Sequence, residues 1–115
     1  MHPHQVPSIA VTEVRERLTD GVTLLDVRER DEWEAGHAPD ALHIPLGELA
    51  GRLDELPEDD EILVVCRSGG RSARATAFLN GNGWDAFNVD TGMKGWAASG
   101  NPVVSERAGS EPTVL

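Results

Sequence analysis

The only cysteine of the chain, Cys66, lies where a strand is expected to meet a helix. An apolar run at residues 62–65 precedes it, and a helical pattern occupies residues 73–79. The backbone N–H groups of a loop at such a turn, together with the helix dipole, favour negative charge. Arg67 and Arg71 add positive charge, so we expect the pKa of the Cys66 thiol to lie below its free value of roughly 8.5. The spacing predicts a nucleophilic thiolate.

The charge of the chain is distributed unevenly around this cysteine. The sequence holds 20 Asp and Glu residues against 10 Lys and Arg residues, a formal net charge of -10. Arg67, Arg71 and Arg74 nevertheless follow Cys66 closely. Local positive charge on an acidic protein favours a focused site for a small anionic substrate, whereas a nucleic-acid partner would need a broad basic face. We therefore expect no nucleic-acid partner.

The length and composition indicate one small domain. At 115 residues the chain is long enough to fold without a metal or a disulfide, and a lone cysteine forbids an internal disulfide. The lone cysteine and the absence of an export leader favour the reducing cytoplasm. No apolar stretch approaches the ~18 residues of a membrane helix, so we expect no membrane partner.

Strands and helices alternate along the sequence. We expect strands near residues 8–10, 23–27, 41–44, 62–65 and 86–89, and helices over residues 12–18, 28–35, 46–56 and 73–79, with a short last helix after the turn at 90–96. Near-continuous apolar strands that alternate with helices predict a parallel α/β sheet covered on both faces. Ligands bind outside the carboxyl ends of such strands, which is where Cys66 lies.

Particular residues set the expected boundaries. Thr12 is a candidate N-cap, and Pro45 begins a helix whose leucines recur at helical spacing. The apolar face of the helix at 73–79 is expected to consist of Ala73, Ala77, Phe78 and Leu79. The chain as a whole is expected to comprise a flexible N-terminus at 1–7, a folded domain at 8–100 and a polar tail at 101–115.

Three segments taken together resemble the rhodanese family, the single-domain sulfurtransferases. They are residues 25–45 with LDVRE, EW, GHAP and IP in order, residues 66–72 with CRSGGRS, and residues 92–96 with GMKGW. The resemblance covers about residues 8–100. It implies an α/β/α domain in which the loop cysteine accepts a sulfane sulfur as a persulfide and passes it to a nucleophile.

The resemblance also assigns roles by position. Cys66 would be the nucleophile and persulfide carrier, and the substrate-binding loop would consist of Arg67, Ser68, Gly69, Gly70, Arg71 and Ser72. The paired glycines would let the loop curl so that its amides surround the sulfur, because glycine tolerates positive φ. The donor would be an anionic sulfur compound, thiosulfate or a persulfide, and the acceptor a thiol, thioredoxin or cyanide. No cofactor and no metal are implied.

Three positions depart from the family pattern. Asp40 replaces a glycine of the first signature, and Thr91 replaces the first of two glycines before Met93. Ser68 stands where two-domain relatives often carry a further basic residue. The last departure leaves open whether thiosulfate or another persulfide is the natural donor.

Other polar residues have structural interpretations. Asp26 and Arg28, at a strand end, are expected to form an ion pair that braces the loop, although contact with substrate is the alternative. His37 and His43 complete no metal-ligand pattern and are expected to be structural.

Two other functions compete with an enzymatic sulfurtransferase. A phosphatase or arsenate reductase on the same fold would place five residues between cysteine and arginine, so that the guanidinium clamps a tetrahedral oxyanion. Here Arg71 follows Cys66 after four residues, and Ser72 occupies the arginine position. The second alternative is a relay protein that takes sulfur from a cysteine desulfurase, or a binding module with an unreactive Cys66. The sequence does not separate an enzyme from a relay, because both use the same cysteine chemistry.

Overall fold

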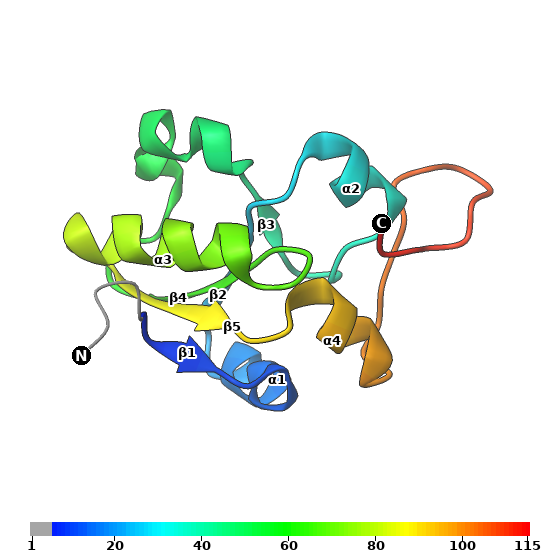
Figure 1. Ribbon diagram of the computed structural model, residues 1–115, viewed down its shortest axis with the longest axis horizontal. Helices are drawn as coiled ribbons and strands as arrows, with labels where there is room; N and C mark the ends of the chain where they lie inside the picture. The colour runs from blue at the N-terminus through cyan, green and yellow to red at the C-terminus, as the bar shows by residue number, and fades with distance from the viewer. Residues whose placement is uncertain (1–5) are drawn as a thin grey trace.

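A parallel β-sheet forms the centre of the molecule in the computed structural model, which describes residues 6–115 (Figure 1). Of the expected N-terminal segment 1–7, residues 1–5 lie outside the described part. The strand order is β1-β5-β4-β2-β3, and every neighbouring pair is parallel. The strands are β1 (Ser8–Ile9), β2 (Thr23–Asp26), β3 (Leu42–His43), β4 (Glu61–Val65) and β5 (Asp85–Val89). The expected parallel α/β fold is confirmed.

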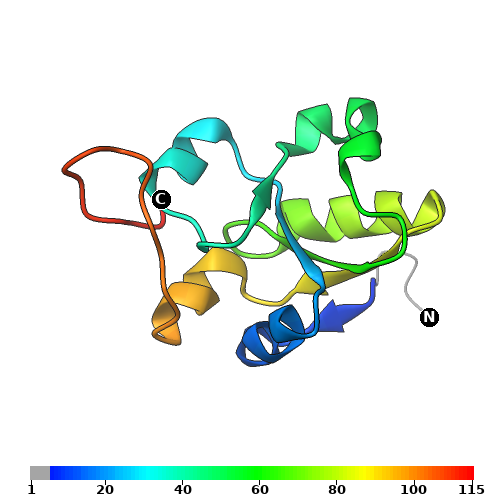
Figure 2. The ribbon, with the colours of Figure 1, turned by 180° about the vertical axis from the view of Figure 1, so that it is seen from behind.

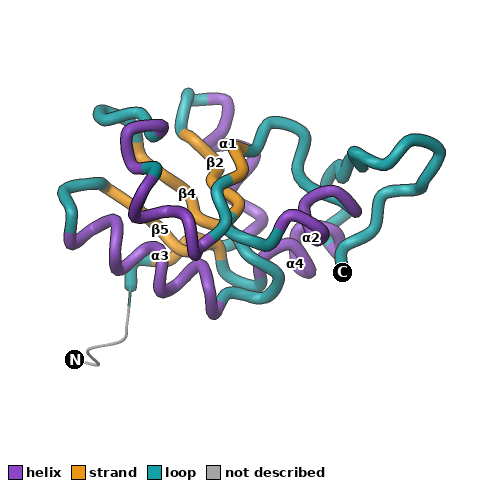
Figure 3. Tube along the Cα trace, turned by 90° about the horizontal axis from the view of Figure 1, so that it is seen from above, coloured by secondary structure: helices purple, strands orange, loops and turns teal. Residues whose placement is uncertain are grey.

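Helices cover both faces of this sheet. Helix α3 (Gly70–Gly81) and the 3-10 helices η1 (Leu46–Gly51) and η2 (Leu53–Glu55) lie on one face, and α1 (Val11–Thr19) lies on the other with α4 (Gly92–Ala98) (Figures 1 and 2). The short helix α2 (Arg30–Ala35) lies near α4 at one end of the molecule (Figure 3), which is the end toward which the strand arrows point in Figure 1. None of the helices between residues 6 and 115 has the length and apolar character needed to cross a membrane.

Alternation along the strands divides the core in two. In β4, Ile62 and Val64 pack in the cluster beneath α3, whereas Leu63 and Val65 pack in the cluster beneath α1. Successive strand residues point to opposite faces, so Cys66, which directly follows β4, returns to the α3 side. The pleat of β4 thus aims the thiol at the first turn of α3.

Three local expectations are wrong. The segment expected as one helix over 46–56 forms two 3-10 helices, and Gly47 and Gly51 within it are poor α-helix formers. Helix α1 begins at Val11 after Ala10, with no side-chain cap from Thr12.

The third wrong expectation concerns the face of α3. Its buried residues are Ser72, Ala75, Thr76 and Leu79, whereas Phe78 is exposed. The helix starts three residues earlier than expected, at Gly70, because the cysteine loop leads directly into its first turn. Two polar residues of α3 therefore lie in the interior, and one of them, Ser72, contacts Cys66.

The segment at 101–115, which we call the C-terminal strap, folds back along α2 (Figure 2). Val104 exchanges backbone hydrogen bonds with His37 in an antiparallel bridge, and the Thr113 N–H donates to the Ala35 carbonyl at 2.9 Å. The strap therefore reaches the same end of the sheet as the cysteine loop.

Candidate active site

Cys66 lies at the carboxyl end of β4 under a loop that curls around its sulfur. The residue is 1% exposed. Its Sγ accepts hydrogen bonds from the Gly69 N–H at 3.1 Å and from the Ser72 hydroxyl at 3.2 Å. Gly69 has φ +121°, a conformation that favours glycine and that turns its amide toward the sulfur. The predicted curl is present at Gly69, whereas Gly70, which was expected to share the positive φ, begins α3 without one.

These contacts favour the thiolate. Burial raises the pKa of the Cys66 thiol, but the Ser72 hydroxyl and the backbone N–H groups of Ser72, Gly69 and Ser68 outweigh it, so the pKa lies below the ordinary value of 9.0. The direction agrees with the sequence-based expectation. The backbone N–H groups act as the sequence led us to expect, and the Ser72 hydroxyl is a donor that it did not predict.

The Ser72 hydroxyl connects Cys66 to a buried amide on the neighbouring strand. Ser72 Oγ lies 2.5 Å from Asn88 Oδ1 and 3.2 Å from Cys66 Sγ, and all three residues are buried. A hydroxyl has one proton, so it cannot donate to both acceptors at once. When Cys66 is a thiolate the hydroxyl donates to sulfur, and the Asn88 amide must then turn its NH₂ group toward Ser72 Oγ. Sequence reasoning missed Asn88, although a polar residue within the apolar run of β5 was a usable signal.

Helix α4 supports the start of the cysteine loop through backbone hydrogen bonds. The Met93 N–H donates to the Cys66 carbonyl at 2.8 Å, and the Lys94 N–H donates to the Arg67 carbonyl at 3.0 Å. A Cβ at Gly92, which has φ +55°, would lie 2.8 Å from the carbonyl carbon of Arg67. The glycine of the last sequence signature therefore lets the first turn of α4 reach the carbonyls of the cysteine loop.

The two arginines of the loop have different environments. Arg71 forms a two-pronged ion pair with Glu32 of α2, at 2.6 and 2.8 Å, and Glu32 also accepts the Glu29 N–H in the capping box of α2. The ion pair lowers the pKa of Glu32 and raises that of Arg71. Arg67 is exposed, and its Nε donates to the backbone oxygen of Leu115 at 2.8 Å.

Comparison with known proteins identifies the fold and its signatures. The model of the rhodanese-like domain family matches residues 10–99. The chain belongs to this family. This agrees with the resemblance of the three sequence segments, of which the first and the last contact the cysteine loop, residues 66–72, in space.

Known relatives of this rhodanese-like domain have names that describe sulfur transfer or the rhodanese family. A sulfurtransferase of Allochromatium vinosum is 38% identical over 88 residues, which cover 76% of this chain and 82% of the relative. A Bacillus subtilis protein whose name describes a sulfur carrier is 38% identical over 94 residues; these cover 79% of this chain but 51% of the relative, about half its length. A solved rhodanese-related protein from Thermoplasma volcanium has a TM-score of 0.80 at 35% identity, covering 85% of this chain and 97% of that one. Family and relatives together support sulfur transfer as the general activity.

In this rhodanese-like domain, Asp26 and Arg28 form a fully buried ion pair. Arg28 Nε lies 3.0 Å from Asp26 Oδ1, and Arg28 Nη2 donates to Asp26 Oδ2 at 2.8 Å and to the Gly36 carbonyl at 2.7 Å. The pair lies at the end of β2, where Asp26 is in register with Val65 of β4. It joins β2 to the end of α2, and its role as a brace for the cysteine loop stays a prediction.

The two histidines of the first signature surround Trp33. The imidazole of His37 stacks on the indole with ring centroids 3.5 Å apart, and that of His43 with centroids 4.7 Å apart. His43 Nε2 donates to the Arg28 carbonyl, and His37 Nε2 lies 2.9 Å from Glu106 Oε2 of the strap. Between residues 6 and 115, no group of His, Cys, Asp and Glu side chains is arranged to hold a metal ion.

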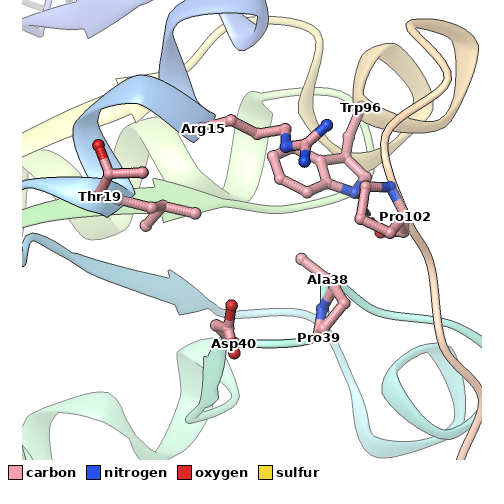
Figure 4. A pocket seen from close by; sticks show the side chains of 8 residues that line it. Arg15, Thr19, Ala38, Pro39, Asp40, Trp96 and Pro102 are labelled. Carbon is pink, nitrogen blue, oxygen red and sulfur yellow. Dashed lines mark hydrogen bonds between the residues drawn. The ribbon is translucent and has the colours of Figure 1, made fainter.

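A cavity of about 230 Å³ lies apart from Cys66, on the α1 face of the sheet (Figure 4). Arg15 of α1 and Asp40 face it from opposite sides, and Trp96 and Pro102 line one end (Figure 4). The Trp96 indole N–H donates to the Pro102 carbonyl at 2.7 Å. The cavity has no contact with the thiol, so the candidate catalytic site is the cysteine loop.

Proposed function

We propose that this protein is a sulfurtransferase that carries a sulfane sulfur on Cys66. The single observation that supports the proposal most is the convergence of the Gly69 N–H and the Ser72 hydroxyl on one buried sulfur. Such donors stabilise an anion because they are already oriented and need no reorganisation during the reaction. The loop therefore favours the Cys66 thiolate. It also favours a persulfide anion, whose charge lies on the sulfur bonded to Sγ.

The proposed reaction has two displacement steps. The Cys66 thiolate attacks the outer sulfur of thiosulfate, the S–S bond of the donor breaks, and sulfite leaves with the electron pair of that bond. Cys66 then carries Sγ–S⁻, whose charge the loop amides stabilise. In the second step a thiol, thioredoxin or cyanide attacks the terminal sulfur and the Cys66 thiolate is restored. The acceptor must come from outside, because the chain has one cysteine.

The environment of the thiol favours a sulfur donor over a phosphate ester. Ser72 takes the place of the arginine that a phosphatase loop needs, and its hydroxyl is directed at the sulfur. Arg71 is paired with Glu32, so its guanidinium does not clamp a tetrahedral oxyanion beside Cys66. A relay protein charged by a cysteine desulfurase would use the same persulfide. We place the activity in the cytoplasm, where a lone thiol stays reduced.

Intact mass spectrometry tests the proposal. Reduced protein is incubated with thiosulfate, freed of excess donor and measured beside a Cys66→Ser variant. We expect a gain of one sulfur atom in the native protein alone, and its loss when cyanide or thioredoxin is added. The proposal is wrong if neither thiosulfate nor glutathione persulfide adds sulfur to Cys66. Phosphate-ester hydrolysis that disappears in the Cys66→Ser variant would instead support the phosphatase alternative.

A further inference from the structure

The C-terminal strap is held along α2 mainly by its backbone. His37 and Val104 exchange two hydrogen bonds of 2.9 Å, and the Ser105 hydroxyl donates to the Glu34 carbonyl at 3.2 Å. The remaining backbone bonds are Glu106 N–H to Glu34 and Thr113 N–H to Ala35, both 2.9 Å. These bonds anchor the strap at both of its ends, so its path is set by α2.

Gly36 provides the space that the strap occupies. A Cβ at this position would lie 2.9 Å from both the backbone N and the carbonyl carbon of Thr113, and closer still to its oxygen. Gly36 has φ 177°, an extended conformation that any residue adopts. A side chain here would therefore push against the strap without straining its own backbone.

Leu115 of the strap lies against Arg67, the residue that follows Cys66. Arg67 Nε donates to the backbone oxygen of Leu115 at 2.8 Å, while the Arg67 carbonyl is held by the Lys94 N–H at 3.0 Å. Within residues 6–115, the two terminal nitrogens of Arg67 make no hydrogen bond or ion pair. Arg71, by contrast, uses both of its terminal nitrogens on Glu32. Of these two arginines, Arg67 is therefore the one whose terminal nitrogens are available to a ligand.

We propose that the strap positions Arg67 so that its two terminal nitrogens receive the anionic group of the reagent that reaches Cys66. The proposal rests on the proposed function for the identity of that reagent, a sulfur donor with a sulfonate-like end. Arg67 is the contact, and the strap acts through it as a positioning element. A guanidinium offers two parallel N–H donors to such an oxyanion, which fixes orientation as well as affinity.

Alkylation of the single cysteine tests this independently of sulfur transfer. Cys66 is labelled with anionic iodoacetate and with neutral iodoacetamide, and the ratio of the two rates reports attraction of anions to the thiol. We expect Gly36→Ala to lower the iodoacetate-to-iodoacetamide ratio about fivefold, because loss of one charge-assisted contact weakens binding by that order. Arg67→Met should lower it equally, and the double variant no further. Gly47→Ala, where a Cβ meets nothing within 4 Å, is the matched control and should leave the ratio unchanged.

A second variant separates release of the strap from misfolding. Thr113→Pro removes the N–H donor to Ala35 without adding atoms at Gly36, and it should lower the ratio in the same direction. In the sulfurtransferase assay, Gly36→Ala and Thr113→Pro should each raise KM for thiosulfate and leave kcat unchanged. This is the pattern expected when binding of the substrate and of the transition state is weakened equally.

The outcomes separate the two proposals. An unchanged ratio in Arg67→Met shows that Arg67 does not receive the anion. A ratio that falls in Arg67→Met but not in Gly36→Ala or Thr113→Pro, with all variants folded by circular dichroism, shows that the strap does not position it. A ratio that rises when the strap is released shows that the strap blocks the site. Absence of a persulfide in the native protein overturns the sulfurtransferase proposal, while the alkylation ratio still decides the role of the strap.

Discussion

The cysteine loop, residues 66–72, and the C-terminal strap, residues 101–115, meet at one end of the sheet but are held in different ways. The loop is held from within, since its carbonyls accept the N–H groups of α4 and its amides and one hydroxyl surround a buried sulfur. The strap is held at the surface, by backbone bonds to α2 and by a single glycine that leaves room for it. Small changes should therefore damage the loop severely and the strap only mildly.

The largest effect is expected at Gly92, beneath the loop. Gly92→Ala places a Cβ against the Cys66 and Arg67 carbonyls and forces a side chain into positive φ. We expect a loss of at least about 2 kcal/mol in the free energy of unfolding, from backbone strain and steric repulsion together. Urea denaturation measures this, and persulfide formation should fall with it. Gly81→Ala is the control, because a Cβ there meets nothing within 4 Å. Native stability and activity in Gly92→Ala would show that α4 does not support the loop.

The next effect concerns the ionisation of Cys66. Ser72→Ala removes the hydroxyl that donates to Sγ, so the pKa of Cys66 should rise and alkylation by iodoacetamide at neutral pH should slow roughly tenfold. The pH dependence of the labelling rate measures the change. Ser68→Ala is the matched control, because the hydrogen bond from Ser68 comes from its backbone N–H, which the variant keeps. Equal labelling profiles in the two variants would contradict a role for the Ser72 hydroxyl.

The same hydrogen bonds make stability depend on pH. The pKa of Cys66 is lower in the folded than in the unfolded chain, so the unfolded state binds more protons in the interval between the two values. The free energy of unfolding should therefore rise with pH across that interval. The contribution is complete above the unfolded pKa and is lost as the pH falls through the folded pKa. In Ser72→Ala this rise should be smaller, which urea denaturation at a series of pH values checks.

The loop and the strap also differ in how far the sequence could predict them. The cysteine loop was predictable because its function needs particular residues in a fixed order, namely a nucleophile followed by a glycine with unusual φ. Asn88 and the pairing of Arg71 with Glu32 were not, because each joins residues from different elements that only the fold brings together. The strap was expected only as a polar tail. Its backbone hydrogen bonds to α2 can be made by almost any residue type, so its sequence does not reveal them.

The helical face of α3 shows a further limit. The alanine and phenylalanine pattern suggested an apolar face, but the helix buries Ser72 and Thr76, and Phe78 remains exposed. The polar residues are inside because Ser72 serves the thiol and Thr76 donates to the Ser72 carbonyl at 2.8 Å. Hydrophobic periodicity fails where a functional site replaces part of the core.

A smaller effect, of opposite sign, is expected at Thr91, next to Gly92. Thr91 has φ +63°, and it is the one residue other than glycine with a positive φ between residues 6 and 115. A β-branched residue is strained there, so Thr91→Gly should raise the free energy of unfolding by about 1 kcal/mol. Thermal and urea denaturation measure the gain. A loss of stability would mean that packing of the Thr91 side chain against Gly95 outweighs the backbone strain.

The smallest effect is expected within the strap, at the contact between Glu106 and His37. The two side chains are 53% and 5% exposed and lie 2.9 Å apart. Glu106 is half exposed, and a glutamine in its place keeps a carbonyl oxygen near His37 Nε2, so Glu106→Gln should cost no more than about 0.5 kcal/mol in the free energy of unfolding. The iodoacetate-to-iodoacetamide ratio at Cys66 should stay at its native value, because the backbone bonds to α2 remain and Gly36 still leaves room. If Glu106→Gln lowers that ratio as far as Gly36→Ala, side-chain electrostatics hold the strap, and the contrast with the loop would need a different physical basis.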